Sequence, residues 1–166
     1  RPHFYPRPGE DMHAAVRREC AAVRTGAGML DASTLGKIDI QGPDAMRFLN
    51  LVTTNAWDRL EVGRSRYAIM CREDGMVFDD GVTTRLAPDR YLMTTTTGNA
   101  ARVLDHLEDY LQTEWPHLKV SLTSVTEHWA AIVITGPRAR DTLAPLLDGV
   151  DISDAALPHM AMRNAT

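Results

Sequence analysis

A chain of 166 residues with 44% hydrophobic side chains can bury a sizeable core, so the sequence predicts a folded protein of one domain or two small ones. Its net charge of −4 comes from interspersed acidic and basic residues, which excludes the basic stripe of a nucleic-acid-binding protein. No apolar run approaches the roughly 20 residues of a membrane helix, and two cysteines without metal-ligand spacing favour free thiols in a reducing cytoplasm.

The two ends of the chain differ from its middle. Residues 1–11 are rich in proline and are expected to form an extended N-terminal arm, with one domain over residues 12–166. The chain begins without an initiator methionine and stops at Thr166 without a closing element. We therefore expect a piece of a longer protein, with a domain that is incomplete at its C-terminus.

Hydrophobic periodicity predicts helices and strands that alternate along the chain. Apolar residues at helical spacing indicate the helices, and strict alternation indicates the strands. The predicted elements are a helix over 12–24, a strand from Met29, a strand over 37–41 with Ile38 and Ile40 facing inward, a short helix after Gly42-Pro43, an irregular segment held to the core by Trp57 and Leu60, a hairpin over 64–86, a strand over 90–95, a helix from Asn99 to Gln112, strands over 118–122 and 129–135, and a helix from Gly136-Pro137 to about Leu147. Helices interleaved with strands on short turns indicate an α+β fold with largely antiparallel sheets.

Three details extend these predictions. Asn99 is expected to cap the helix that follows it. The strand over 129–135 consists almost entirely of apolar residues, which indicates burial on both faces. The segments 38–49, IDIQGPDAMRFL, and 132–143, IVITGPRARDTL, share a strand, Gly-Pro and a short helix, which leaves duplication within the fold and chance recurrence as equal alternatives.

The hairpin over 64–86 contains the most informative acidic residue. A polar turn at 72–75 pairs Tyr67 with Asp80, and cross-strand partners share a face. Asp80 is then expected on an apolar, core-facing wall, whereas Asp79 lies on the wetter face. A carboxylate on such a wall costs free energy unless it is hydrogen-bonded or binds something, so it is a candidate functional group.

Two other interpretations of Asp80 remain open. The carboxylate can be structural, capping a neighbouring backbone or pairing with an arginine. Alternatively the loop is one residue longer, which would exchange Asp79 and Asp80 between the two faces.

Several well-known motifs are absent from the sequence. It contains no GxGxxG after a strand, no GxxxxGK[ST] and no HExxH, so dinucleotide, nucleoside triphosphate and zinc-protease functions lack support. The six histidines are scattered without ligand spacing, and no metal site is predicted.

Residues 19–37, ECAAVRTGAGMLDASTLGK, resemble the opening signature of the glycine cleavage T-protein (aminomethyltransferase) superfamily. Further motifs of that superfamily follow in the same order: Gln41-Gly42-Pro43-Asp44-Ala45 with Phe48-Leu49, Thr54-Asn55, Tyr67, the pair Asp79-Asp80, and Gly136-Pro137-Arg138-Ala139. Because the matches span almost the whole chain from Glu10 onward, chance is a poor explanation.

Other segments are more similar to one branch of the superfamily. DGMVFDDGVTTRL, TTTTGNA and TSVTEHWA resemble the C-terminal region of the α subunits of heterotetrameric sarcosine oxidases. T-proteins typically have Ser-His-Met-Gly where this chain has Ser33-Thr34-Leu35-Gly36, which favours the oxidase branch over glycine cleavage.

This resemblance implies a tetrahydrofolate-binding, one-carbon-transfer module. In sarcosine oxidases, flavin chemistry elsewhere in the complex oxidises an N-methyl group, and this region captures the one-carbon unit as 5,10-methylenetetrahydrofolate. The expected partners are folate and the other subunits of a cytoplasmic heterotetramer, with FAD, FMN and NAD bound elsewhere in the complex and no role for nucleic acid or membrane. The isolated chain is expected to be inactive.

The resemblance also assigns site residues. Asp80 corresponds to the second aspartate of the family's Asp-Asp pair, on the N10 side of the folate, and is the expected catalytic residue. Tyr67 corresponds to a pocket tyrosine, Leu35 and Val82 to wall positions, and Thr96 lies near a family asparagine. A partly desolvated carboxylate can orient N10 and exchange the proton that ring closure releases.

The family closes its folate site with a later Arg-x-Ser/Tyr-x-Thr-Gly-Glu segment, which this chain does not contain. The sequence therefore predicts half a pocket. The alternatives are a fragment of a dimethylglycine dehydrogenase or of a true aminomethyltransferase, and a non-catalytic assembly module of a flavin amine oxidase complex.

Overall fold

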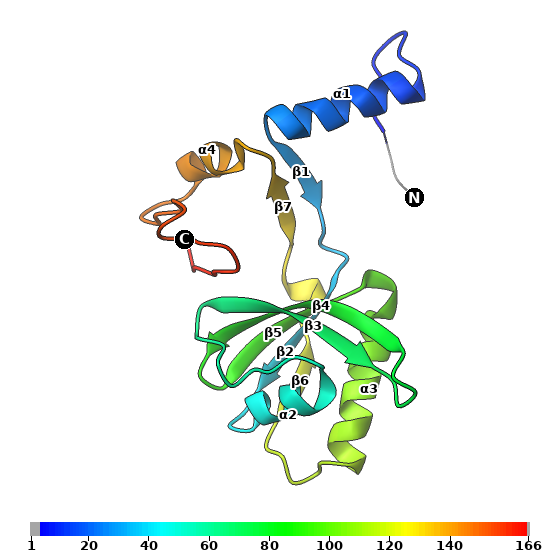
Figure 1. The fold of residues 1–166 in the computed structure, drawn as a ribbon, viewed down its shortest axis with the longest axis vertical. Coiled ribbons are helices and arrows are strands. Elements are labelled where there is room, and N and C mark those ends of the chain that lie inside the picture. The colour runs from blue at the N-terminus through cyan, green and yellow to red at the C-terminus, as the bar shows by residue number, and fades with distance from the viewer. Residues whose placement is uncertain (1–3, 166) are drawn as a thin grey trace.

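The structure is a computed structural model that describes residues 4–165 (Figure 1). Its helices are α1 (Met12–Thr25), α2 (Ala45–Val52), α3 (Ala100–Thr113) and α4 (Ala139–Leu143), with 3-10 turns at Thr97–Asn99, Thr126–His128 and Ala144–Leu146. Its strands are β1 (Gly28–Asp31), β2 (Gly36–Gln41), β3 (Arg64–Cys71), β4 (Val77–Ala87), β5 (Arg90–Thr95), β6 (Ser121–Ser124) and β7 (Ile132–Thr135). Residues 1–3 of the expected arm lie outside the described residues, and residues 4–11 form neither helix nor strand.

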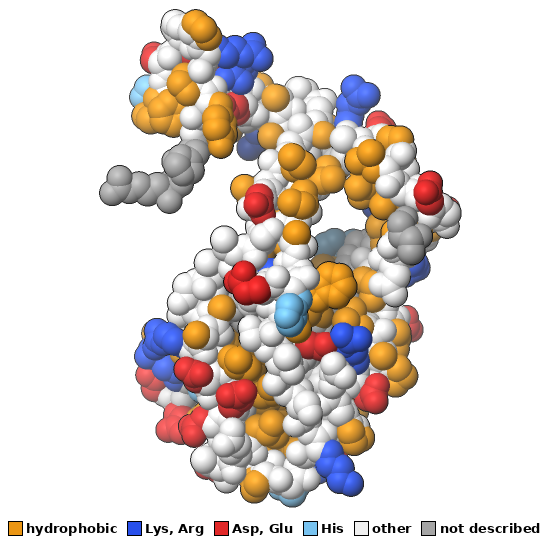
Figure 2. Space-filling model, turned by 180° about the vertical axis from the view of Figure 1, so that it is seen from behind, with side chains coloured by type: hydrophobic (Ala, Val, Ile, Leu, Met, Phe, Trp, Pro, Cys, Tyr) orange, Lys and Arg blue, Asp and Glu red, His pale blue; other side chains and the backbone are white. Residues whose placement is uncertain are grey.

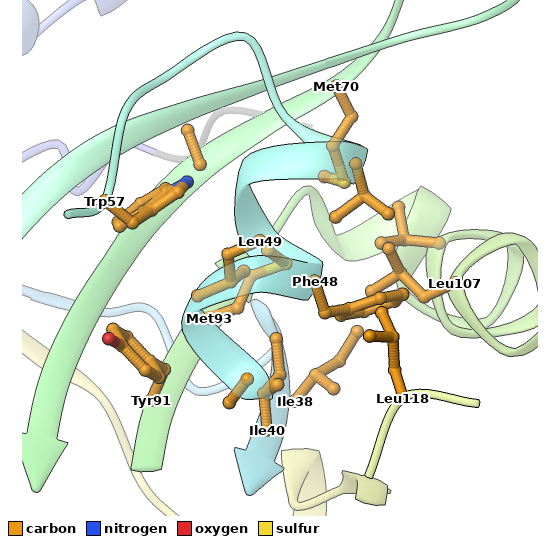
Figure 3. Close-up of a cluster of buried hydrophobic side chains, with 14 of the residues drawn as sticks. Ile38, Ile40, Phe48, Leu49, Trp57, Met70, Tyr91, Met93, Leu107 and Leu118 are labelled. Carbon is orange, nitrogen blue, oxygen red and sulfur yellow. The ribbon is translucent and has the colours of Figure 1, made fainter. Parts of the chain in front are cut away.

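Five strands form the main sheet in the order β3-β4-β5-β2-β6, and all neighbouring strands are antiparallel. Helices α2 and α3 pack on its inner face, where Phe48 and Leu49 of α2 meet Ile38 and Ile40 of β2 and Leu107 of α3 (Figure 3). All five side chains are at most 2% exposed, which confirms the inward orientation predicted for the two isoleucines. The α+β class with antiparallel sheets is likewise confirmed.

The irregular segment between α2 and β3 is anchored by the residues that the sequence indicated. Trp57 is fully buried, and its indole N–H donates to the hydroxyl of Thr53 over 2.8 Å. Leu60 is 5% exposed. This segment therefore belongs to the core although it has no regular structure.

The strand register of the β3–β4 hairpin differs from the prediction by two residues. The loop spans residues 72–76 rather than 72–75, and a β-bulge follows it. Asp80 consequently pairs with Ile69 instead of Tyr67. Asp79 takes the buried position, 5% exposed, whereas Asp80 is exposed. The longer loop and the bulge each shift the register by one residue, so Asp80 still shares a face with Tyr67, as predicted. The prediction that this face points to the core is wrong, because Ala68, Met70 and Asp79 are buried on the opposite face.

Strands β1 and β7 form a separate two-stranded ribbon, which stands away from the main sheet and has α1 and α4 at its far end (Figure 1). The predicted strand over 129–135 is shorter than expected and is not buried, since Trp129, Ile132 and Val133 are 58%, 52% and 43% exposed. Among the described residues, β7 pairs only with β1 and no second layer covers it. Figure 2 shows hydrophobic side chains gathered where the ribbon meets the main sheet.

Three predicted boundaries need correction. Asn99 makes no side-chain cap, and its side-chain nitrogen donates instead to the Phe78 carbonyl and the Asp79 carboxylate. The strand expected over 118–122 is β6, which begins only at Ser121, where its pairing with β2 starts. The last α-helix ends before the 3-10 turn Ala144–Leu146, since the proline at its start cannot continue the helical hydrogen bonds.

The repeated strand-Gly-Pro-helix pattern has a structural counterpart. Gly42 follows β2 with a φ of 137°, and Gly136 follows β7 with a φ of 108°. Each helix begins three residues later, and each glycine carbonyl accepts the first amide of its helix. A Cβ at Gly42 would lie 2.1 Å from the Lys119 carbonyl oxygen, so only glycine fits there. The local structure repeats, while a common origin of the two units stays a hypothesis.

Candidate functional site

The residues predicted for the site lie on the outer face of the main sheet, opposite α2 and α3. Tyr67 pairs with Val82, and Ile69 pairs with Asp80, so the four side chains share this face. Tyr67 is 61% exposed, Ile69 is 39% exposed, Asp80 is exposed and Val82 is half-buried. The result is one carboxylate beside an aromatic ring and two aliphatic side chains on an open surface.

The ends of β2 and β5 complete this surface. Gly36 pairs with Thr95, which brings the preceding Leu35 and the following Thr96 to the same edge of the sheet. The amide of Thr96 donates to the Asp79 carboxylate over 3.0 Å, so this edge also adjoins the β4 segment that contains Asp80. The structure thus brings together all the predicted site residues: Leu35, Tyr67, Asp80, Val82 and Thr96.

Thr94 joins β4 to β5 beside these residues. Its hydroxyl oxygen accepts the Val82 amide over 2.9 Å and donates to the Val82 carbonyl over 3.0 Å. The backbone pairing of β4 with β5 begins at Thr83–Met93. The hydrogen bonds of the Thr94 side chain extend this pairing by one residue along each strand. Sequence reasoning interpreted the threonine run only as a strand entering a helix, and nothing in that run distinguishes Thr94 from its neighbours.

The two adjacent aspartates have different roles. The buried Asp79 carboxylate accepts the Thr96 amide and, at 3.4 Å, the Asn99 side-chain amide, which stabilises the start of α3. Asp79 therefore has the structural role that was considered for Asp80. Asp80 is exposed, and none of the ion pairs between described residues includes it. The partial desolvation expected from an apolar wall is accordingly absent at Asp80.

Ile69 was missed by sequence reasoning as a site residue. Side chains two positions apart in a strand share a face, so the spacing from Tyr67 was a usable signal. The edge of β3 at Ile69 is covered by the preceding loop, because the Ile69 amide donates to the Asn55 side chain over 3.1 Å and its carbonyl accepts the Thr54 amide. The Thr54-Asn55 motif thus supports the strand that presents Ile69 and Tyr67.

Residues 4–165 contain neither a cluster of metal ligands nor a helix suited to crossing a membrane. No three histidine, cysteine, aspartate or glutamate side chains gather there in a way that could hold a metal ion. Nor does any helix in that range combine the length and apolar character needed to cross a membrane.

The amino-acid sequence matches the family model described as GCVT N-terminal domain over residues 1–166. It is 59% identical over 163 residues to a protein named sarcosine oxidase subunit alpha from Corynebacterium sp. (strain P-1). That match covers 98% of this chain and 17% of the relative, so the chain spans a small part of the length of that protein.

Solved structures with a similar fold include an aminomethyltransferase and a sarcosine oxidase. The glycine cleavage system aminomethyltransferase T from Bartonella henselae matches with a TM-score of 0.72 and 27% identity, over 79% of this chain and 35% of that one. The heterotetrameric sarcosine oxidase from Corynebacterium sp. U-96 matches with a TM-score of 0.52 and 17% identity, over 86% of this chain and 67% of that one, which shows likeness of fold alone. The resemblance inferred from the motifs is confirmed.

Proposed function

Because this chain belongs to the GCVT N-terminal domain family, we propose that it is the tetrahydrofolate-binding, one-carbon-transfer region of a sarcosine oxidase α subunit. Its role there is to capture an oxidised N-methyl group as 5,10-methylenetetrahydrofolate. The 59% identity to a sarcosine oxidase α subunit, against 27% to the aminomethyltransferase structure, supports the oxidase branch.

One observation carries the proposal: the outer face of the main sheet presents a carboxylate and a tyrosine ring that the fold does not need for its core. Tyr67 is 61% exposed, and Asp80 is exposed two positions before Val82. A flat surface of aromatic and aliphatic groups suits a planar heteroaromatic ring, and a carboxylate suits its amine donors. These residues therefore fit one wall of a reduced-folate site, with Leu35 and Thr96 at its edge.

Bound tetrahydrofolate supplies two amine nitrogens, N5 and N10, that together hold the one-carbon unit. The Asp80 carboxylate would accept a hydrogen bond from the N–H on the N10 side. It would also take up or return the proton that this nitrogen exchanges. Tyr67, Ile69 and Val82 fix the plane of the ring by contact. Most of the rate gain comes from this positioning, because the amine is already nucleophilic.

The proposal extends to the whole complex. The other subunits of the oxidase are the partners, FAD, FMN and NAD bind elsewhere in it, and this region alone has no activity. A cytoplasmic location is consistent with Cys20 and Cys71, which are both free thiols.

The test uses the assembled oxidase with Asp80→Asn in this region. We expect sarcosine oxidation to continue at the wild-type rate, while the yield of methylenetetrahydrofolate falls about tenfold or more and free formaldehyde rises instead, as for loss of an acid-base group. Asp89→Asn, at the exposed turn between β4 and β5, is the matched control and should behave as wild type.

Three results would change the proposal. Equal product partition in the Asp80→Asn and wild-type complexes would remove the chemical role of Asp80. A wild-type complex that does not bind tetrahydrofolate would remove the folate function. If the complex oxidises dimethylglycine and not sarcosine, the chain belongs to a dimethylglycine dehydrogenase and not to a sarcosine oxidase.

A non-catalytic assembly module is the second candidate, and the exposed ribbon favours it. Met29 and Leu30 of β1 are 78% and 63% exposed, and Val133 of β7 is 43% exposed, which is typical of an interaction surface. If the chain is an assembly module, Val133→Lys should prevent assembly of the complex. Asp80→Asn should then change neither assembly nor the ratio of methylenetetrahydrofolate to formaldehyde.

A further inference from the structure

Lys37 is a buried cation that the proposed chemistry does not use. It lies in β2 and is only 3% exposed. Its ammonium group donates to the carbonyl oxygens of Ser33 at 2.9 Å, Leu35 at 3.0 Å and Thr126 at 3.3 Å. An ammonium has three donors, so these three acceptors satisfy it and offset the cost of burying its charge.

The acceptors belong to two different connections between the main sheet and the ribbon. Ser33 and Leu35 lie between β1 and β2, and Thr126 lies between β6 and β7. The Lys37 backbone joins the same segments, since its amide donates to the Thr126 hydroxyl at 3.0 Å and its carbonyl accepts the Val125 amide at 2.8 Å. Lys37 is thus the point at which both connections are held together.

This junction borders the proposed folate wall. Lys37 pairs with Thr94, the residue whose hydroxyl bonds both backbone groups of Val82. Val82 in turn pairs with Tyr67. The Lys37 ammonium also binds the carbonyl of Leu35, the residue at the edge of that wall. A row of contacts therefore runs across the sheet from the buried cation to the exposed tyrosine.

We propose that Lys37 is a positioning residue that clamps the two connections together and thereby sets the edge of the reduced-folate site at Leu35. The inference rests on the proposed function for its ligand, while the clamp itself is a property of this fold. Lys37 does not touch the reacting atoms, so it affects binding of folate and leaves proton transfer at Asp80 unchanged.

The test compares Lys37→Met with Lys119→Met in the assembled oxidase. Methionine has nearly the length of lysine without its charge, and Lys119 is exposed, which makes it the matched control. For Lys37→Met we expect the KM for tetrahydrofolate to rise about tenfold with kcat within about twofold of wild type, as for loss of a positioning contact. We also expect faster amide exchange in residues 32–35 and 125–131, and Lys119→Met should match wild type in both readouts.

An unchanged KM or unchanged amide exchange in Lys37→Met overturns the inference, and so does a loss of kcat without a change in KM. If the wild-type complex does not bind tetrahydrofolate, the proposed function fails, and the exchange measurement alone decides whether Lys37 is a clamp. If the Lys37→Met protein does not fold, Thr126→Val replaces it, because it removes the hydroxyl that accepts the Lys37 amide. That variant should raise the same KM about threefold, and a wild-type KM would overturn the inference.

Discussion

Asp79 and Asp80 are neighbours in β4, yet one carboxylate is buried and the other exposed. The buried one can remain because the Thr96 amide and the Asn99 side chain bond to it. The exposed one has no such structural role and lies beside Ile69 on an open face. Strand alternation thus separates a structural acid from a candidate catalytic acid within two residues.

Replacing Asp79 should reduce stability far more than replacing Asp80. Asp79→Ala removes a charged acceptor from a buried position and is expected to lower the free energy of unfolding by about 1–3 kcal/mol. Asp80→Ala, at an exposed position, should change it by less than about 0.5 kcal/mol. Equilibrium unfolding in urea measures both values, and a greater loss for Asp80→Ala would show that the two roles are assigned the wrong way round.

Two contacts with α3 decide how the elements of the main domain fit together. The first is at Gly36 of β2, where an added Cβ would lie 2.0 Å from the Thr95 hydroxyl oxygen and 2.6 Å from the Ala100 Cβ. The second is at His106 of α3, whose ring lies between those of Phe78, 4.8 Å away, and Tyr110, 4.7 Å away. The first contact leaves no room for a side chain at position 36, and the second places an imidazole beside two aromatic rings.

Gly36→Ala should destabilise the protein by about 1–3 kcal/mol, because the new methyl group would separate the start of α3 from the sheet. Gly98→Ala is the control, since a Cβ there would meet nothing within 4 Å. Thermal unfolding of the two variants provides the comparison. Equal melting temperatures would mean that the strand and the helix move apart without cost.

Stability should also depend on pH through His106. Burial lowers the pKa of this imidazole from 6.5, although the nearby Asp109 carboxylate partly opposes the shift. The unfolded chain therefore binds a proton at a higher pH than the folded protein does. The contribution of the neutral ring is fully present above pH 6.5 and is lost as the pH falls through the lowered pKa of the folded state.

His106→Phe keeps an aromatic ring at this position and cannot be protonated. We expect its free energy of unfolding to fall less steeply than that of wild type as the pH is lowered from 6.5. Urea unfolding at a series of pH values measures the difference. Parallel curves for the two proteins would show that protonation of His106 is not linked to unfolding.

Over the whole molecule, burial is concentrated in the main sheet with α2 and α3. Neither strand of the ribbon contains a buried residue, and Ala15 is the buried residue of α1. The core cluster, in contrast, is formed by the main sheet, the two helices packed on it and the loops next to them (Figure 3). Local stability follows the density of buried apolar contacts, so the two parts should differ in how readily they open.

Hydrogen exchange should resolve this difference. Amides of β1, β7 and α1 are expected to exchange about a hundredfold faster than those of β2 and β5, which corresponds to an opening free energy lower by about 2.7 kcal/mol. Mass spectrometry of peptides from each element measures the rates. Uniform protection across both parts would mean that they unfold as one cooperative unit.

The sequence by itself determined the local elements, the inward orientation of Ile38 and Ile40, and the shared face of Tyr67, Asp80 and Val82, because periodicity and alternation are properties of the chain alone. Only the tertiary structure decided which aspartate is buried, because the core forms on the face that presents Ala68, Met70 and Asp79 and leaves the face of Tyr67 and Asp80 open. It also decided that the apolar strand near Trp129 is exposed, because burial depends on a second layer and not on the composition of the strand.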